Sequence, residues 1–144
     1  MSAYILTITL NPAIDRIIRH DRGLSPVGSF AGGKGVNVAR AFRALGIPAR
    51  AIGLAGGPAG RTLDGLLDRE GIPHRFFLIQ GDTRTNVTMV RKDGVVRRKV
   101  VPGPRVTREE RDAFAAFFTR SIRGAGAIIF SGSLPLRFPV KAFV

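Results

Sequence analysis

The residues best suited to hold a ligand form a glycine-rich stretch in the first third of the chain. Gly32, Gly33 and Lys34 lead directly into a helical pattern, and Asn37 follows one turn later. Glycines expose backbone N–H groups, and the first turn of a helix has unpaired donors and a partial positive charge. Lys34 adds a mobile charge, and Asn37 both donates and accepts hydrogen bonds. The stretch therefore predicts a site for an anion or several hydroxyl groups, with close packing of a helix on a sheet as an equal alternative.

Two more groups of polar residues follow apolar runs. Asp15 comes soon after the β-branched run at residues 5–10. Ser131 and Ser133 come directly after the run at residues 127–130. In open α/β sheets, ligand groups collect beyond the carboxyl ends of the strands. The carboxylate could orient hydroxyl groups and the serines could contact a ligand, but position alone favours a solvated carboxylate or turn cap at Asp15 and leaves a turn cap open for the serines.

Two common nucleotide-binding motifs fit the glycine stretch only in part. Residues 28–34 have most of the P-loop spacing, but Gly35 stands where a Ser or Thr must reach Mg²⁺. The dinucleotide fingerprint fails at Val38, where a third glycine is required. A nucleotide-binding P-loop is therefore not expected here. The chain also has no cysteine, which excludes a disulfide framework, a thiolate zinc site and a cysteine nucleophile.

The formal net charge of +13 over 144 residues raises the question of nucleic-acid binding. The basic residues are scattered and mostly arginines, and with no tryptophan and one tyrosine there is no stacking platform. Attraction for small anionic substrates is therefore expected, rather than a specific nucleic-acid partner. The start of the chain has neither a basic segment nor a long apolar run, which argues against a signal peptide or a membrane partner and favours the cytoplasm.

The elements that must position these residues alternate between strand and helix. Strands are expected at residues 5–10, 49–54, 75–79 and 127–130, the last of them short and buried. Helices are expected from the glycines to Gly46, from about residue 61 to 70, and from a capping box made by Thr107 and Glu110. Leu45 completes the apolar face expected for the first helix. This order predicts a layered, mostly parallel sheet.

Two segments depart from this alternation. Residues 14–18 suggest a short strand or ribbon, and a loop is expected at residues 21–26. Residues 86–91 and 95–101 predict a hairpin around Asp93-Gly94, and three consecutive basic residues in its second arm suit an exposed flap. A further helix is expected to begin near Pro139.

Five short motifs, taken together and in order, resemble the PfkB, or ribokinase-like, carbohydrate kinases. They are Thr9–Arg16, Gly32–Arg40, Thr83–Asn86, Pro102–Pro104 and Ser131–Pro135. The branch with 1-phosphofructokinase and tagatose-6-phosphate kinase is the most similar. The implied fold is α/β, with a layered, mostly parallel sheet, flanking helices and a small β lid, truncated before the ATP-binding half. Residues 1–144 would be the N-terminal part of one such domain, with lid elements at about 14–20 and 86–101.

The resemblance implies a sugar-phosphate kinase that transfers the γ-phosphoryl group of Mg·ATP to a hydroxyl of a phosphorylated ketohexose. Asp15 matches the residue that binds sugar hydroxyls, and Lys34 would help to hold the substrate's phosphate. The lid would close over the sugar, exclude water and pair two subunits as a homodimer. The residues implied to bind the substrate are Asp15, Gly32, Gly33, Lys34, Asn37, Arg84 and Ser133.

The chain departs from the family pattern at three places near the lid. The segment Leu24–Ala31 is shorter than usual, so one lid strand is expected to be curtailed. Ala31 replaces a usual proline, and Val100 and Val101 stand where Asn-Glu is common. These differences bear on the geometry of the lid and on the choice of substrate.

The family's catalytic base is an aspartate in a Gly-Ala-Gly-Asp motif, which this chain lacks. Gly124-Ala-Gly126 is followed by Ala127 and not by an aspartate. No catalytic or metal-binding residue is therefore expected here, and ATP and Mg²⁺ would be held mainly by the missing half. The isolated chain is expected to be inactive and to expose an unpaired sheet edge. The alternatives are a non-catalytic sugar-phosphate-binding fragment or degenerate relative and, with less support, a basic nucleic-acid-binding protein.

Overall fold

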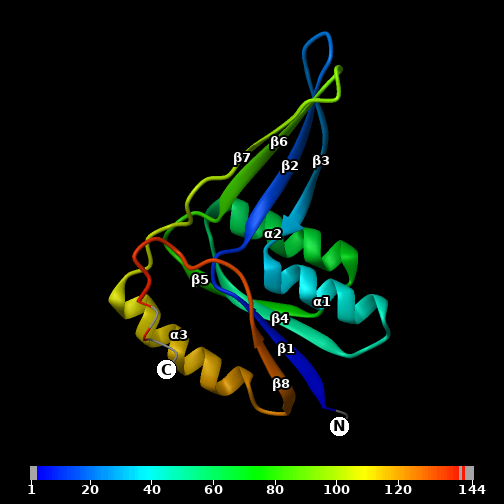
Figure 1. Cartoon of the computed structure of the whole chain (residues 1–144). Coiled ribbons are helices and arrows are strands. Elements are labelled where there is room, and N and C mark those ends of the chain that lie inside the picture. Colours follow the sequence, from blue (N-terminus) through cyan, green and yellow to red (C-terminus); the bar gives the residue numbers. More distant parts are fainter. Residues whose placement is uncertain (1–2, 140, 142–144) are drawn as a thin grey trace.

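The computed structural model describes residues 3–139 and 141, which form an α/β body and a smaller sheet projecting from it (Figure 1). The helices of the described part are α1 (Lys34–Ala44), α2 (Gly57–Glu70) and α3 (Arg108–Ser121). Its strands are β1 (Tyr4–Thr9), β2 (Ala13–His20), β3 (Leu24–Gly32), β4 (Ala49–Gly56), β5 (His74–Ile79), β6 (Arg84–Arg91), β7 (Val96–Lys99) and β8 (Ala125–Phe130). The predicted layered fold with a β lid is confirmed.

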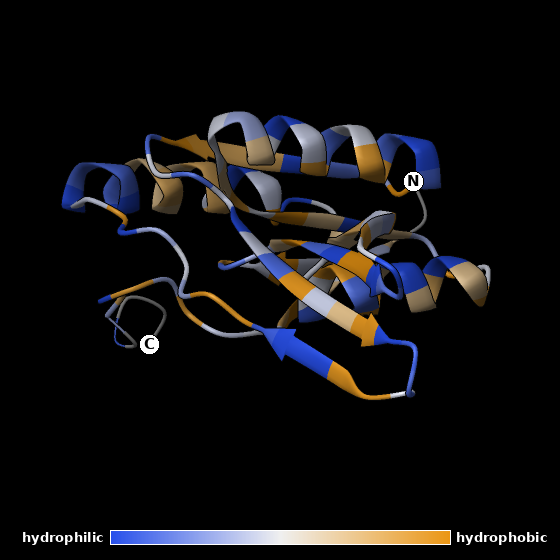
Figure 2. Cartoon of the chain, turned by 90° about the horizontal axis from the view of Figure 1, so that it is seen from above, coloured by the Kyte–Doolittle hydropathy of each residue, from blue (hydrophilic) through white to orange (hydrophobic). Residues whose placement is uncertain are grey.

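The body is built on a sheet of four parallel strands in the order β5-β4-β1-β8, called here the body sheet. Side chains alternate between its two faces, and β4 shows how the faces differ. Ala51 and Ala55 face α1 and α2, where small residues allow the helices to lie close. Ile52 and Leu54 face the other side, where they pack in the same cluster as the phenylalanines of α3. The strands are largely hydrophobic as a result (Figure 2).

The ends of the helices follow local signals in the sequence. Gly46 and Gly71 adopt the left-handed conformation just beyond α1 and α2, with φ of 71° and 63°. Thr107 and Glu110 form the predicted capping box at the start of α3. The predicted start of α2 was too late: the helix begins at Gly57, because Pro58 fits the first turn of a helix.

Two predictions about burial were wrong. Leu45 was expected on the apolar face of α1 but is 72% exposed, because the helix ends at Ala44 and the chain turns away. The strand β8 was expected to be buried, but Ile128 and Phe130 are 42% and 46% exposed. β8 is the last strand of the body sheet and pairs only with β1 among the described strands, so one side of its ladder is open.

The second sheet, called here the lid sheet, has the strand order β3-β2-β6-β7. The hairpin of β6 and β7 is present as predicted, and Gly94 in its turn has a φ of 80°. The loop expected at residues 21–26 was wrong from Leu24 onward, because residues 24–32 form the nine-residue strand β3, which pairs with all eight residues of β2. The register shifts between Ile17 and Ile18, where Val27 is an extra residue on β3 with no partner on β2.

Two further observations complete the fold. No helix in the described part of the chain is long and apolar enough to cross a membrane. The helix expected to begin near Pro139 falls mainly on residues 140 and 142–144, which lie outside the described residues.

Candidate functional site

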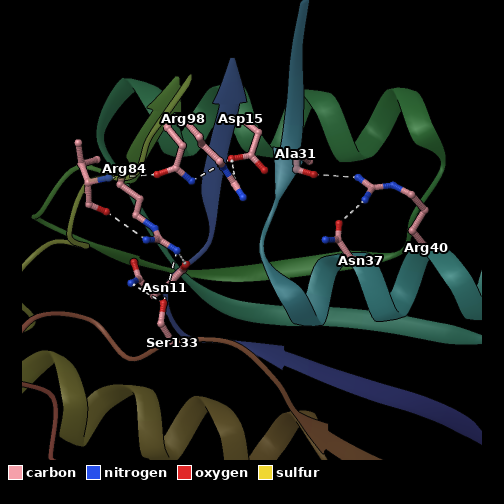
Figure 3. Close-up of polar contacts among 10 residues, drawn as sticks. Asn11, Asp15, Ala31, Asn37, Arg40, Arg84, Arg98 and Ser133 are labelled. Atoms are coloured by element: carbon pink, nitrogen blue, oxygen red, sulfur yellow. Dashed lines mark hydrogen bonds and ion pairs between the residues drawn. The ribbon is translucent and has the colours of Figure 1, made fainter. Parts of the chain in front are cut away.

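Six of the seven predicted substrate-binding residues line one cavity of about 490 Å³ between the body and the lid sheet. The seventh, Gly32, lies directly beneath Asp15. Of these residues, Figure 3 shows Asp15 on β2, Asn37 on α1, Arg84 on β6 and Ser133 on the segment that follows β8. The cavity is lined by Asn11, Ala13, Asp15, Gly33, Lys34, Asn37, Arg84, Asn86, Arg98, Val100, Gly132 and Ser133.

Asp15 is the acidic residue of the cavity, and it lies within β2 rather than in a loop at the end of β1. Its Oδ1 accepts a hydrogen bond of 2.9 Å from the side-chain amide of Asn86. The same oxygen lies 3.4 Å from the guanidinium of Arg98. A side chain at position 32 would run into this carboxylate, so the close approach of β3 to β2 requires Gly32. The carboxylate is therefore positioned by the lid sheet and retains free acceptor capacity for hydroxyl groups.

The entrance of α1 forms the opposite wall of the cavity. Gly33 has a φ of 123°, which is strained for any other residue, and it precedes the first helical residue, Lys34. The Oδ1 of Asn37 accepts a 2.6 Å hydrogen bond from Arg40, which leaves the amide N–H₂ of Asn37 to donate into the cavity. The helix entrance thus presents a lysine, an amide donor and the unpaired backbone N–H groups of its first turn.

Arg84 contacts three separate segments at the base of the cavity. Its guanidinium donates to the carbonyl oxygens of Val101 at 3.0 Å and of Asn11 at 3.1 Å, and it lies 3.4 Å from the hydroxyl of Ser133. Burial lowers the pKa of Arg84 from its ordinary value, and the nearby Asp15 opposes this effect. An arginine remains protonated under these conditions, so Arg84 supplies a fixed positive charge at the base of the cavity.

Six residues that line the cavity were not among the predicted site residues, and three of them, Asn11, Asn86 and Arg98, have polar side chains. Asn11 donates to Ser133 Oγ at 3.1 Å and to the carbonyl of Leu134 at 3.2 Å. Asn11 and Asn86 both lie inside motifs that pointed to the site, so the motifs contained the signal. Arg98 had no such signal, because only the pairing of β7 with β6 brings it opposite Thr88 and over the cavity.

A bound Mg·ATP would need a place for the metal and for the nucleotide. Among the described residues, no three His, Asp or Glu side chains lie close enough together to hold a metal ion. The cavity offers a single carboxylate, that of Asp15, which is already close to Asn86 and Arg98. The residues present therefore do not fit a metal–nucleotide site. Besides this carboxylate, the cavity is lined by the cationic side chains of Lys34, Arg84 and Arg98.

Comparison with known proteins shows the family and the fold of the chain. The model of the pfkB carbohydrate kinase family matches residues 13–144. Phosphofructokinase-2 from Escherichia coli, solved with fructose-6-phosphate, is similar with a TM-score of 0.85 and 29% identity, over 99% of this chain and 49% of that chain. A possible 1-phosphofructokinase from Thermotoga maritima has a TM-score of 0.83 and 31% identity, over 94% of this chain and 47% of that chain.

The tetrameric inhibited form of the Escherichia coli phosphofructokinase-2 is similar with a TM-score of 0.85 and 30% identity, over 97% of this chain and 48% of that chain. The chain therefore spans about half the length of these solved structures. Because the family match extends over residues 13–144 and the fold agrees with that of solved phosphofructokinases along nearly the whole chain, this protein belongs to the PfkB family of carbohydrate kinases.

Proposed function

We propose that this chain provides the acceptor site of a sugar-phosphate kinase similar to 1-phosphofructokinase. The acceptor would be a phosphorylated ketohexose, which receives the γ-phosphoryl group of ATP on a hydroxyl. The observation that carries the proposal is the shared cavity of Asp15, Lys34 and Arg84, in which one acidic and two basic side chains face a common space. The solved Escherichia coli relative holds fructose-6-phosphate, which supports this class of ligand.

The proposed binding mode follows from the chemistry of these side chains. Asp15, held by Asn86, accepts hydrogen bonds from the sugar hydroxyls and thereby orients the ring. The amide of Asn37 donates to ring or hydroxyl oxygens from the opposite wall. Lys34, Arg84 and the backbone N–H groups at the entrance of α1 attract the phosphate of the sugar.

The lid sheet would close the site and join two subunits. It carries several exposed apolar side chains, an arrangement that favours contact with another surface. They are Leu24, Val27, Phe30, Val95, Val96 and Val100. A homodimer through the lid is in keeping with these residues, and a tetrameric form is known for the Escherichia coli relative. Closure would exclude water from the transferred phosphoryl group and so limit hydrolysis of ATP.

The 144-residue chain by itself is expected to bind the sugar phosphate without transferring a phosphoryl group. Its sequence contains no Gly-Ala-Gly-Asp motif for a catalytic base. Transfer depends on positioning both donor and acceptor and on neutralising charge, and the described residues position only the acceptor. ATP and Mg²⁺ would be needed for the activity of the family but would be held mainly by residues outside this chain.

Titration calorimetry with fructose 1-phosphate tests the acceptor site. The chain should bind this ligand saturably, and Asp15→Ala should remove most of the affinity, because the hydroxyl acceptor is lost. Asp21→Ala is the matched control, since Asp21 lies on the same hairpin but faces solvent outside the cavity. Absence of saturable binding, or equal affinity of the Asp15→Ala variant, would refute the proposal. A coupled assay with ATP and Mg²⁺ should detect no sugar-dependent turnover by the 144-residue chain.

A further inference from the structure

A second cavity of about 620 Å³ adjoins the proposed sugar site on the side of the lid sheet and α2. It has an apolar wall that includes Phe30 and Leu66, and a basic rim that includes Arg69. Asp15, Asn37 and Arg98 line both cavities. The ion pair of Asp15 and Arg98 therefore stands at the boundary between the sugar site and the outer cavity (Figure 3).

Arg98 faces this boundary because of its place on β7. Successive side chains of a strand point to opposite faces, so Arg98 points toward the cavity while its neighbours Arg97 and Lys99 point away from it. The Nη2 of Arg98 lies 3.4 Å from Asp15 Oδ1, and the side chain is 56% exposed. An ion pair that is this long and this exposed holds its partners weakly.

Two other arginines that line these cavities, Arg84 and Arg40, are held much more firmly. Arg84 donates to the backbone carbonyls of Val101 and Asn11. Arg40 donates to Glu70 through two nitrogens and to the carbonyl of Ala31 at 2.8 Å. Within the described residues, Arg98 has its only hydrogen bond with Asp15, at the limit of hydrogen-bonding distance. Its planar guanidinium could therefore leave Asp15 and bind the oxygens of a phosphate in pairs, the geometry that arginine favours.

We propose that Arg98 is the residue that makes this site specific for a phosphorylated sugar. This inference rests on the proposed function and deepens it. In the free protein, Arg98 covers Asp15. When a sugar phosphate enters, its phosphate takes Arg98 from Asp15, and the released carboxylate accepts the sugar hydroxyls. A sugar without phosphate leaves Arg98 on Asp15 and must compete with it. Because Arg98 lies on β7, contact with the phosphate also draws the hairpin of the lid over the ligand.

The first experiment compares Arg98→Ala with Arg97→Ala, adjacent positions on the same strand whose side chains point to opposite faces. Binding of fructose 1-phosphate and of unphosphorylated fructose is measured for each variant. Arg98→Ala should lower the affinity for fructose 1-phosphate by about tenfold or more, which is the range expected when a hydrogen bond between charged groups is lost. Its affinity for fructose should stay the same or rise, and Arg97→Ala should match the unaltered chain for both ligands. Arg98→Lys should recover only part of the loss, because an ammonium group cannot bind in the paired geometry.

The second experiment uses inorganic phosphate as the probe. Asp15→Asn should raise the affinity for phosphate severalfold, because Arg98 is freed from its partner. The gain should disappear in the double variant Asp15→Asn with Arg98→Ala. If the gain came only from removing the repulsion between Asp15 and phosphate, it would persist in the double variant, and the inference would be overturned.

The results separate this inference from the proposed function. If the unaltered chain does not bind fructose 1-phosphate, the proposed function fails, and this inference fails with it. If the chain binds the ligand and Arg98→Ala keeps the full preference for the phosphorylated sugar, only the role of Arg98 is refuted. An equal loss of affinity for fructose 1-phosphate and for fructose in Arg98→Ala would also refute the role of Arg98, since that result indicates a general structural role. Melting temperatures of all variants, measured in parallel, show that each one is folded.

Discussion

The body sheet and the lid sheet differ in what holds their strands in place. In the body sheet, Leu6 and Ile8 of β1 are at most 1% exposed, and helices cover both faces. In the lid sheet, every residue of β7 is exposed, and much of its surface is hydrophilic (Figure 2). Backbone hydrogen bonds between strands therefore position most of the lid sheet, whereas the packing of side chains positions the strands of the body sheet.

The body and the lid also contribute different features to the candidate site. The body fixes the entrance of α1 and the loop of Ser133, and these give the cavity its shape. The lid carries Asp15 and Arg98, the two charges whose partners change in our proposal. In the proposed function, a wall held by side-chain packing and a wall held by strand pairing would together enclose and release the ligand.

The largest expected effect tests whether the packing of side chains holds the body but not the lid. Phe114 is 1% exposed and packs edge-on against Phe77, with the ring centres 6.0 Å apart. Phe114→Ala should lower the free energy of unfolding by about 3–5 kcal/mol, because it leaves a cavity in the core. Val96→Ala, on a lid residue that is 59% exposed, should change it by no more than about 0.5 kcal/mol. Urea unfolding measures both values, and similar losses would contradict the comparison.

A second prediction concerns the close contact between β3 and β2 at the base of the lid. Gly32→Ala should weaken fructose 1-phosphate binding by about tenfold or more, because the added methyl group displaces the carboxylate of Asp15. Gly23→Ala, at the end of the same sheet, meets no atom within 4 Å and should bind normally. Calorimetry compares the two, and normal binding by the Gly32 variant would show that the lid adjusts more easily than the contact implies.

A third, smaller effect should be confined to the body. Thr107→Ala removes the hydroxyl that accepts the N–H of Glu110 at 3.1 Å and should cost about 1 kcal/mol of unfolding free energy. Thr119→Ala is the control, because that exposed hydroxyl only bonds the carbonyl of Ala115 within α3. Sugar binding should not change in either variant, and its loss on Thr107→Ala would show that the body and the site are more tightly coupled than proposed.

The same substitution should also alter a titration that NMR can follow. Hydrogen bonds from the backbone and from Thr107 hold the pKa of Glu109 below its ordinary value. Stability from this effect is present above the ordinary pKa of Glu109 and is lost as the pH falls through the lowered value. In the Thr107→Ala variant, the pKa of Glu109 should move back toward its ordinary value. An unchanged pKa would show that the backbone alone sets it.

The smallest effect has the opposite sign. Gly65 lies inside α2, and a methyl group there meets no atom within 4 Å. Gly65→Ala should therefore raise the free energy of unfolding by roughly 0.5–1 kcal/mol, because it reduces the freedom of the unfolded chain. Gly71→Ala should lower stability instead, since Gly71 has a φ of 63° at the end of the same helix. Thermal melting distinguishes the two outcomes.

Much of the fold could be predicted because its signals are local. The capping box at Thr107, the glycine beyond α2 and the Asp93-Gly94 turn each act within a few residues, and the structure has all three. The full length of β3 was not predicted, because its sequence of Ser, Pro and Gly has weak strand propensity and only pairing with β2 makes it a strand from Leu24 on. The exposure of β8 was missed because an apolar run does not reveal whether its strand lies at an edge.

By itself, the sequence determined the order of the elements, the family motifs and most of the candidate site, from Asp15 to Ser133. It did so because periodicity, caps and motifs are properties of neighbouring residues. Only the tertiary structure decided that Asp15 would form an ion pair with Arg98, which lies 83 residues later in the chain. It also decided that Arg97 would face away from the cavity. Such contacts depend on the register between strands, and a shift of one residue would exchange the two arginines.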